Sequence, residues 1–239
     1  AVQLPPYRND LLHTVDVVED VAISQGYARF APVMPSQFTV GGLSRLEQMA
    51  DRVRHLMVGL EFQEIISNIM GSHQDFCTRM RLDGTEWAKV VEVDNVMSLS
   101  YSCLRQWITP SLLQVETNSS RAFYPHRMFE VGEVAIPDAS ADVGSRTVTM
   151  LGAVIAHAGA HFSEIHSCLD LLLYYLDRPF TLEPVDHPSF LDGRAGKIVS
   201  NGRVIGLLGE LHPEVLEDWQ IGVPAVALEV EIDRLLEEV

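Results

Sequence analysis

The sequence contains little cysteine and no long hydrophobic run. Its three cysteines, Cys77, Cys103 and Cys168, are far apart, odd in number and never form a CxxC pair. A disulfide framework and a zinc ribbon are therefore not expected, and a reducing cytoplasm fits this usage best. No apolar stretch approaches the roughly 20 residues that span a bilayer, and no basic segment followed by an apolar segment marks a signal peptide.

The sequence is also poor in positive charge. Seventeen lysines and arginines stand against 33 aspartates and glutamates, which gives a formal net charge of −16. Such a chain repels phosphate backbones, so we do not expect it to bind nucleic acid through a non-specific basic surface. The glycine-rich loops of Rossmann and P-loop proteins are missing as well.

Apolar residues at helical spacing predict several helices. One spans residues 10–25, with Asp10 as N-cap and Gly26 as its stop. A second covers about 43–60, a third 162–177 with Ser163 as N-cap, and a fourth about 101–121 with a kink near Pro110.

Strand patterns fill most of the remaining sequence. Alternating or β-rich runs lie at 61–70, 87–95, 127–135, 146–158 and 225–233, and a helix begins after the last of them. Asn201-Gly202 stands between two apolar alternating runs, which is the strongest short-range signal for a hairpin. Hairpins with interspersed helices predict an α+β fold with a largely antiparallel sheet.

Two groups of side chains have the chemistry to bind a metal. The segment HAGAHFSEIH offers His157, His161 and Glu164 for zinc, as in a metal-dependent hydrolase, although the spacing is not HExxH. The competing interpretation is a polar loop between a strand and a helix. No GxSxG motif or activated cysteine indicates nucleophilic catalysis.

The second group is a set of carboxylates near the start of the chain. On a helix, Asp16, Glu19 and Asp20 stand at i, i+3 and i+4 and project from one face, with Asp10 at the helix start. The helix dipole and solvent can offset their repulsion. Mg²⁺ could do so too, because it prefers carboxylate and water oxygens. From composition alone, the dipole and solvent are the favoured explanation.

Several motifs, in order, resemble the β subunit of phenylalanyl-tRNA synthetases. The segments PPYRNDLLHTVDVVEDVAISQGY, VDNVMSLSYSCLRQWITPSLL, RMFEVGEVA, HPSFLDGRAGKI and GLLGELHPEVLEDWQI are similar to signatures of that family, with Val96 where proline is usual. They run from about residue 5 to the C-terminus. The shorter segments look like the archaeal or eukaryotic type of subunit.

The resemblance implies a class II synthetase fold, with an antiparallel sheet flanked by helices. Residues 1–26 would be the end of a preceding module and an entry helix, and residues 27–239 the catalytic-like domain of a longer β subunit. The family's magnesium ligands correspond to Asp10, Asp16, Glu19 and Asp20, and we expect this site to need the α subunit's share as well.

The resemblance also implies that this chain has no catalytic residues of its own. In the stretch LEVEIDRL, Glu229 and Glu231 would replace the glycines of the ATP-binding motif while Arg234 is retained, and two carboxylates would repel triphosphate. Arg127 is out of register with the family's arginine in motif 2. We therefore expect a scaffold for the α subunit, with tRNA contacts that are indirect or local.

The expected contact with the α subunit is the apolar stripe of the second helix. In the family, such helices build a four-helix bundle in an (αβ)₂ enzyme. The residues of this stripe are Leu46, Met49, Val53, Leu56, Met57 and Leu60. An unpaired stripe would favour a homodimer when the chain is isolated. The alternatives are a stand-alone synthetase paralogue that activates an amino acid, the metal-dependent hydrolase, and an interaction module that no longer belongs to a synthetase.

Overall fold

The computed structural model describes residues 3–119 and 121–236. The chain divides into two compact units, Ala1–Gly42 and Leu43–Val239, which are described separately. In the described part of the chain, no helix is long and apolar enough to cross a bilayer.

The first unit contains helix α1 (Thr14–Gln25) and a 3₁₀ turn, η1 (Tyr27–Arg29). The helix begins four residues later than predicted, and its N-cap is His13 rather than Asp10. The reason is a capping box: the His13 ring accepts the backbone N–H of Val15, and the Asp16 carboxylate accepts the N–H of His13 at 2.7 Å. Gly26, with φ 79°, ends the helix as predicted.

The second unit is built on a seven-stranded sheet with the order β1-β5-β6-β10-β9-β8-β7. All neighbours pair antiparallel except β1 and β5. A small sheet has the order β2-β4-β3. The strands are β1 (Gln63–Glu64), β2 (Met70–Gly71), β3 (Val91–Glu92), β4 (Cys103–Leu104), β5 (His126–Pro137), β6 (Ser145–Ala156), β7 (Thr181–Pro184), β8 (Phe190–Ser200), β9 (Arg203–Leu211) and β10 (Ala225–Glu231).

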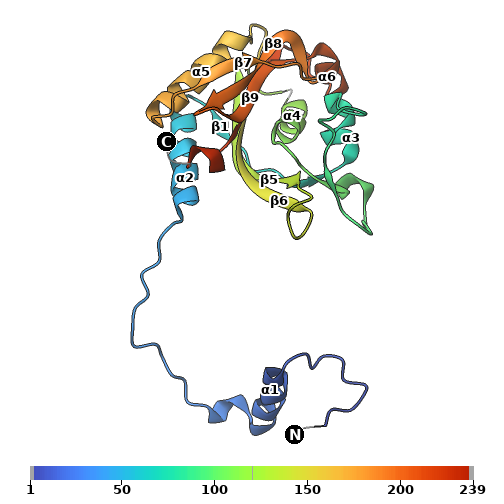
Figure 1. Cartoon of the computed structure of the whole chain (residues 1–239), viewed down its shortest axis with the longest axis vertical. Helices are drawn as coiled ribbons and strands as arrows, with labels where there is room; N and C mark the ends of the chain where they lie inside the picture. The colour runs from blue at the N-terminus through green and yellow to red at the C-terminus, as the bar shows by residue number, and fades with distance from the viewer. Residues whose placement is uncertain (1–2, 120, 237–239) are drawn as a thin grey trace. The chain divides into compact units, whose positions relative to one another are not determined.

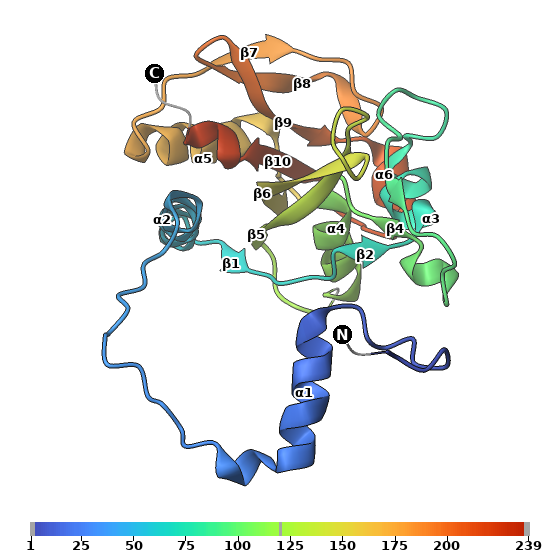
Figure 2. The same ribbon diagram turned by 60° about the horizontal axis from the view of Figure 1, so that its bottom comes forward.

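Helices cover both faces of this sheet, as Figures 1 and 2 show. The helices are α2 (Arg45–Gly59), α3 (His73–Phe76), α4 (Thr109–Asn118), α5 (Phe162–Tyr175) and α6 (Pro213–Asp218), with 3₁₀ turns η2 (Thr78–Met80), η3 (Leu99–Tyr101) and η4 (Asp233–Leu235). Residues of α2 and α5 form one core with one face of the sheet, and residues of α4 and α6 form a second core with the other face. The antiparallel-dominated α+β fold is therefore confirmed.

Local signals predicted the long elements better than the short ones. The hairpin at Asn201-Gly202 is present, with positive φ at both residues, as a type I′ turn requires. The runs 61–70 and 87–95 form only two-residue strands. The predicted kinked helix is wrong, because Pro110 lies in the first turn of α4, where its missing N–H costs no hydrogen bond. His161, not Ser163, precedes α5.

Gly206 on β9 provides a test of how closely the central strands pack. A β-carbon there would lie far inside van der Waals contact with the backbone oxygen of Glu229 on β10. We expect Gly206→Ala to lower the free energy of unfolding by about 2 kcal/mol or more, because neither strand can move without breaking the sheet. Urea unfolding measures this. Gly222→Ala, where a β-carbon meets nothing, is the control, and an equal loss in both variants would contradict the packing argument.

Candidate functional site

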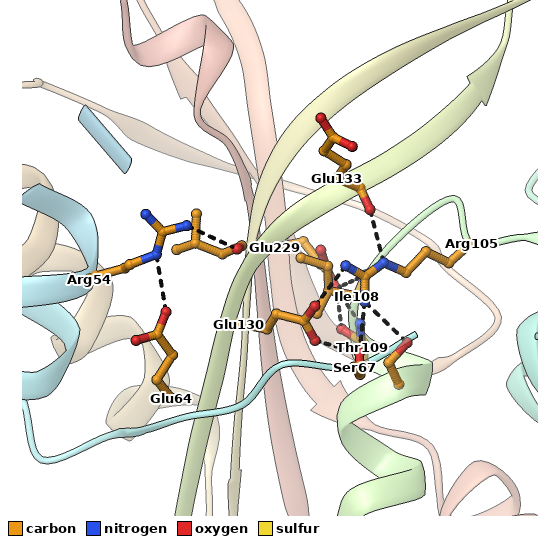
Figure 3. A network of polar contacts seen from close by, with 11 residues as sticks. Arg54, Glu64, Ser67, Arg105, Ile108, Thr109, Glu130, Glu133 and Glu229 are labelled. Atoms are coloured by element: carbon orange, nitrogen blue, oxygen red, sulfur yellow. Dashed lines mark hydrogen bonds and ion pairs between the residues drawn. The ribbon is translucent and has the colours of Figure 1, made fainter. Parts of the chain in front are cut away.

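A buried carboxylate links the last strand of the sheet to the start of helix α4. The side chain of Glu229 on β10 is 1% exposed. Its Oε1 accepts the backbone N–H groups of Ile108 at 2.9 Å and Thr109 at 2.6 Å, and also the Thr109 hydroxyl (Figure 3). Ile108 precedes the helix and offers no side-chain cap, so Glu229 serves as the helix's N-terminal acceptor from 120 residues away.

Burial raises the pKa of Glu229 from 4.5 to about 7, despite the hydrogen bonds from Thr109 and Ile108 and the positive charge of Arg105, which lower it. The second carboxylate oxygen, Oε2, is buried and has no hydrogen-bond partner within the described residues. The site therefore holds a carboxyl group that changes charge near neutral pH and retains one unused polar atom.

A second buried group beside Glu229 is the Arg105–Glu130 pair. The Arg105 guanidinium donates to Glu130 at 2.7 Å, to Ser67 at 2.8 Å and to the carbonyl of Glu133 at 2.9 Å (Figure 3). Both charged side chains are almost fully buried. This network joins the loop before α4 to β5, and so holds the start of α4 against the sheet.

Glu229 also lines a cavity of about 510 Å³ on the α4 side of the sheet. Its walls combine strands β5, β6, β8, β9 and β10 with the segments 82–89 and 106–107. Trp87 and Trp107 lie against His187, with ring centroids 4.5 and 5.5 Å from the His187 ring. Burial lowers the pKa of His187 from 6.5 to about 4, so its ring is neutral at pH 7. The cavity has the size and the mainly apolar walls of a small-molecule site.

The histidine group predicted for zinc does not assemble. His157 Nε2 lies 2.8 Å from Glu164, whose other oxygen accepts the Arg127 guanidinium at 2.7 Å. The His161 ring instead contacts the carbonyl of Gly159. Within the residues that the structure describes, no three His, Cys, Asp or Glu side chains come together to hold a metal. Nothing in this geometry supports a metal-dependent hydrolase.

Comparison with known sequences identifies the family. The model described as "Phenylalanyl tRNA synthetase beta chain CLM domain" matches residues 31–232, and the model described as "tRNA synthetase B5 domain" matches residues 1–27. The chain belongs to the phenylalanyl-tRNA synthetase β-chain family. The resemblance that its motifs indicated is thereby confirmed.

Curated relatives agree over almost the whole chain. Proteins named "Phenylalanine--tRNA ligase beta subunit" match at 39% identity in Treponema pallidum, 40% in Borrelia recurrentis and 41% in Borrelia garinii. The matches cover 97–98% of this chain but only 38–41% of each relative. The chain thus spans about two fifths of the length of these β subunits.

The residues that the family resemblance assigned to an ATP motif lie in different places. Glu229 lines the cavity, whereas Glu231 does not. Glu231 is ion-paired with Arg146 and Arg234, and Arg234 also donates to the carbonyl of Val204. Arg127 pairs with Glu164 of α5 and lies over the ring of Phe62, away from the cavity.

Three of the four acids predicted as magnesium ligands already have other partners in the first unit. Arg8 pairs with Asp10 at 2.7 Å and with Asp20 at 3.0 Å, and its hydrogen bonds lower the pKa of Asp10. Asp16 accepts the backbone N–H groups of Leu12 and His13. Glu19 is exposed on α1. In this arrangement the Arg8 guanidinium supplies the counter-charge of Asp10 and Asp20, and magnesium binding by the four carboxylates stays a prediction.

The apolar stripe of α2 mainly faces the core of its own domain. Val53 and Met57 are fully buried. The rest of the predicted interface stays partly exposed while packing against the same core; these residues are Leu46, Met49, Leu56 and Leu60. A hollow of about 240 Å³ lies between α2 and α5 beside Leu56 and Leu60.

Sequence reasoning did not find the cavity. Its aromatic walls, Trp87, Trp107 and His187, come from segments 20 to 100 residues apart that no local pattern connects. One signal was available in the composition: the chain has only two lysines, Lys89 and Lys197, and both line this cavity.

The raised pKa of Glu229 predicts a pH-dependent stability. Because the folded-state pKa lies above the ordinary value, the folded state gains from protonation of this carboxyl. That contribution is complete below pH 4.5 and is lost as the pH rises through about 7. As the pH rises from 5 to 8, the unchanged chain should lose roughly 2 to 3 kcal/mol of unfolding free energy that the Glu229→Gln variant does not lose.

Urea unfolding at both pH values measures this difference. Glu183→Gln removes an exposed carboxyl from β7 and should leave the pH dependence of unfolding nearly unchanged. A Glu229→Gln variant whose stability tracks the unchanged chain at both pH values would show that burial does not hold the Glu229 pKa near neutrality.

Proposed function

We propose that this domain serves phenylalanine–tRNA ligase as a non-catalytic, class II synthetase-like scaffold for the α subunit. The enzyme would be an (αβ)₂ heterotetramer of the cytoplasm that attaches phenylalanine to tRNA(Phe) with ATP. The observation that carries the non-catalytic part is Glu229. Its buried carboxyl group lines the cavity on the sheet and is held there by the start of α4.

The remaining charges also argue against ATP chemistry in this chain. A class II site needs arginines aimed at the triphosphate, yet Arg127 and Arg234 are each bound to a carboxylate outside the cavity. Lys89 and Lys197 line the cavity, but Glu229, once deprotonated above about pH 7, would repel the several negative charges of a triphosphate there. An ATP–pyrophosphate exchange assay tests this part, and exchange by the chain alone would favour the stand-alone synthetase.

The surface that supports α-subunit binding is the joint outer face of α2 and α5. Leu171, Tyr174 and Tyr175 of α5 are 45%, 76% and 56% exposed. Leu171 and Tyr175 line the hollow opposite Leu56 and Leu60 of α2. Tyr174 lines the adjoining surface of α5 together with Leu171. A pair of helices with a shared apolar groove is a typical docking surface for another helix. When the chain is isolated, the same face would support a homodimer.

Substitution on this face tests the proposed contact. Leu171→Glu places a charge in the hollow, and burying that charge against a partner is costly. We expect at least a tenfold loss of affinity for the α subunit of the same organism, because a charge without a partner in an interface costs more than 1.4 kcal/mol. Light scattering on a sizing column and a binding titration measure the loss.

Val204→Glu is the matched control. Val204 has a similar exposure, 41%, but lies at the start of β9 and does not line the hollow between α2 and α5. Equal loss of binding in both variants, or no loss in Leu171→Glu with an unchanged melting temperature, would contradict an α2–α5 interface. An unchanged chain that binds no α subunit would favour the independent module.

We also propose that Asp10, Asp16, Glu19 and Asp20 bind Mg²⁺ only in the assembled enzyme, where Arg8 no longer pairs with Asp10 and Asp20. Arg8→Met removes the competing cation. At low ionic strength we expect this variant to bind Mg²⁺ about tenfold more tightly than the unchanged chain, since released carboxylates attract a hard cation. Isothermal titration measures the affinity. Arg29→Met, which loses only a contact with Gln25, is the control; equal affinity in all three would contradict competition by Arg8.

A further inference from the structure

We propose that the cavity beside Glu229 binds a small planar aromatic anion. This inference goes beyond scaffolding, because a domain that only holds a partner needs no such site. It rests on three observations that coincide at one place: the chain's two lysines, a cluster of aromatic walls, and two buried polar atoms without partners.

The lysines indicate the charge of the ligand. In a chain with 33 acidic residues, Lys89 and Lys197 both line this cavity. Neither ammonium group makes a hydrogen bond or ion pair within the described residues, although most arginines of the chain have carboxylate partners. Lys197 is half-buried on β8, where an unpaired charge is costly. An anionic group on a ligand would supply the missing partner.

The aromatic walls indicate the body of the ligand. Trp87 and Trp107 flank His187, which stays neutral at pH 7 because its pKa is low. Stacked or tilted rings at these separations favour another planar ring between or beside them. The apolar residues Met150 and Leu207 form part of the same lining. A cavity of about 510 Å³ accommodates one or two fused rings with a short acidic substituent.

The unpartnered atoms indicate that polar contacts are missing. The indole N–H of Trp107 and Oε2 of Glu229 are buried and have no partner within the described residues, and both residues line the cavity. A buried donor and a buried carboxyl oxygen are each unfavourable when they form no hydrogen bond. An acceptor atom on the ligand would take the hydrogen bond of the Trp107 indole N–H. When Glu229 is protonated, its Oε2 could donate a hydrogen bond to another acceptor on the same ligand.

The other charged residue at the cavity does not cancel this preference. Glu86 is exposed on the same segment as Lys89, so both are at the solvent side. The inner groups are Lys197, neutral His187 and Glu229, which is about half protonated at pH 7. The inner part of the cavity is therefore the most favourable place for an anion that is also aromatic.

The test compares three probes that share one ring system. These are 1-naphthoate, 1-naphthyl phosphate and the neutral 1-naphthalenemethanol, each titrated calorimetrically into the purified chain at pH 6.5. We expect one site per chain and at least tenfold tighter binding of an anion than of the alcohol, as one charge-assisted hydrogen bond provides. The two anions distinguish a carboxylate site from a phosphate site. Equal affinity for the alcohol, or no binding of either anion, would overturn the proposal.

Variants locate the site. Lys197→Met should lower the affinity for the preferred anion about tenfold and leave the alcohol unaffected, and Lys197→Arg should restore most of it. Trp107→Phe keeps a ring but removes the N–H, and should lower affinity several-fold. Arg194→Met removes an exposed cation from the same strand outside the cavity and is the control for net charge. Anion binding that survives Lys197→Met, in a variant with an unchanged melting temperature, would place the ligand elsewhere and refute the assignment.

Discussion

The contact between the Glu229 carboxylate and the first amides of α4 determines the interior of this domain. A helix that begins inside a protein exposes N–H groups that water cannot reach, and α4 has no cap of its own at Ile108. Glu229 supplies the acceptor from the centre of the sheet. The contact requires close packing: Gly152, its partner across β6 and β10, leaves no room for a β-carbon against Ile108. Arg105 and Glu130 then hold the approach to the helix from the other side.

The same contact bears on the proposed absence of ATP chemistry in this domain. A helix held against the middle of the sheet needs a fixed acceptor on the strand beneath it, and a carboxyl oxygen of Glu229 supplies it. Once that carboxylate is there, its charge above neutral pH opposes triphosphate in the adjoining cavity. One residue therefore supplies the acceptor for the start of α4 and also places a carboxyl group at the cavity.

The sequence predicted those features that depend on neighbours along the chain. The hairpin at Asn201-Gly202 and helix α5 are specified by local turn chemistry and apolar spacing, and both are present. The strands predicted at 61–70 and 87–95 are reduced to the two-residue strands β1, β2 and β3, and β4 lies where a helix was predicted, because each of these strands depends on a partner elsewhere in the chain. The role of Glu229 was hidden for the same reason, since its partners are about 120 residues away. The sequence places Glu229 and Glu231 two residues apart in one motif, whereas the structure shows that only Glu229 lines the cavity.

The apolar stripe of α2 shows why a pattern alone does not identify an interface. A heptad-like stripe has the same sequence signature whether it covers its own core or another subunit, because both bury the same side chains. Here Val53 and Met57 are fully buried within the domain. Only residues at the edges of the stripe keep surface for a partner, and there α5 adds Leu171 and two tyrosines. A subunit interface on this face must therefore be composed from both helices, since neither presents enough apolar surface by itself.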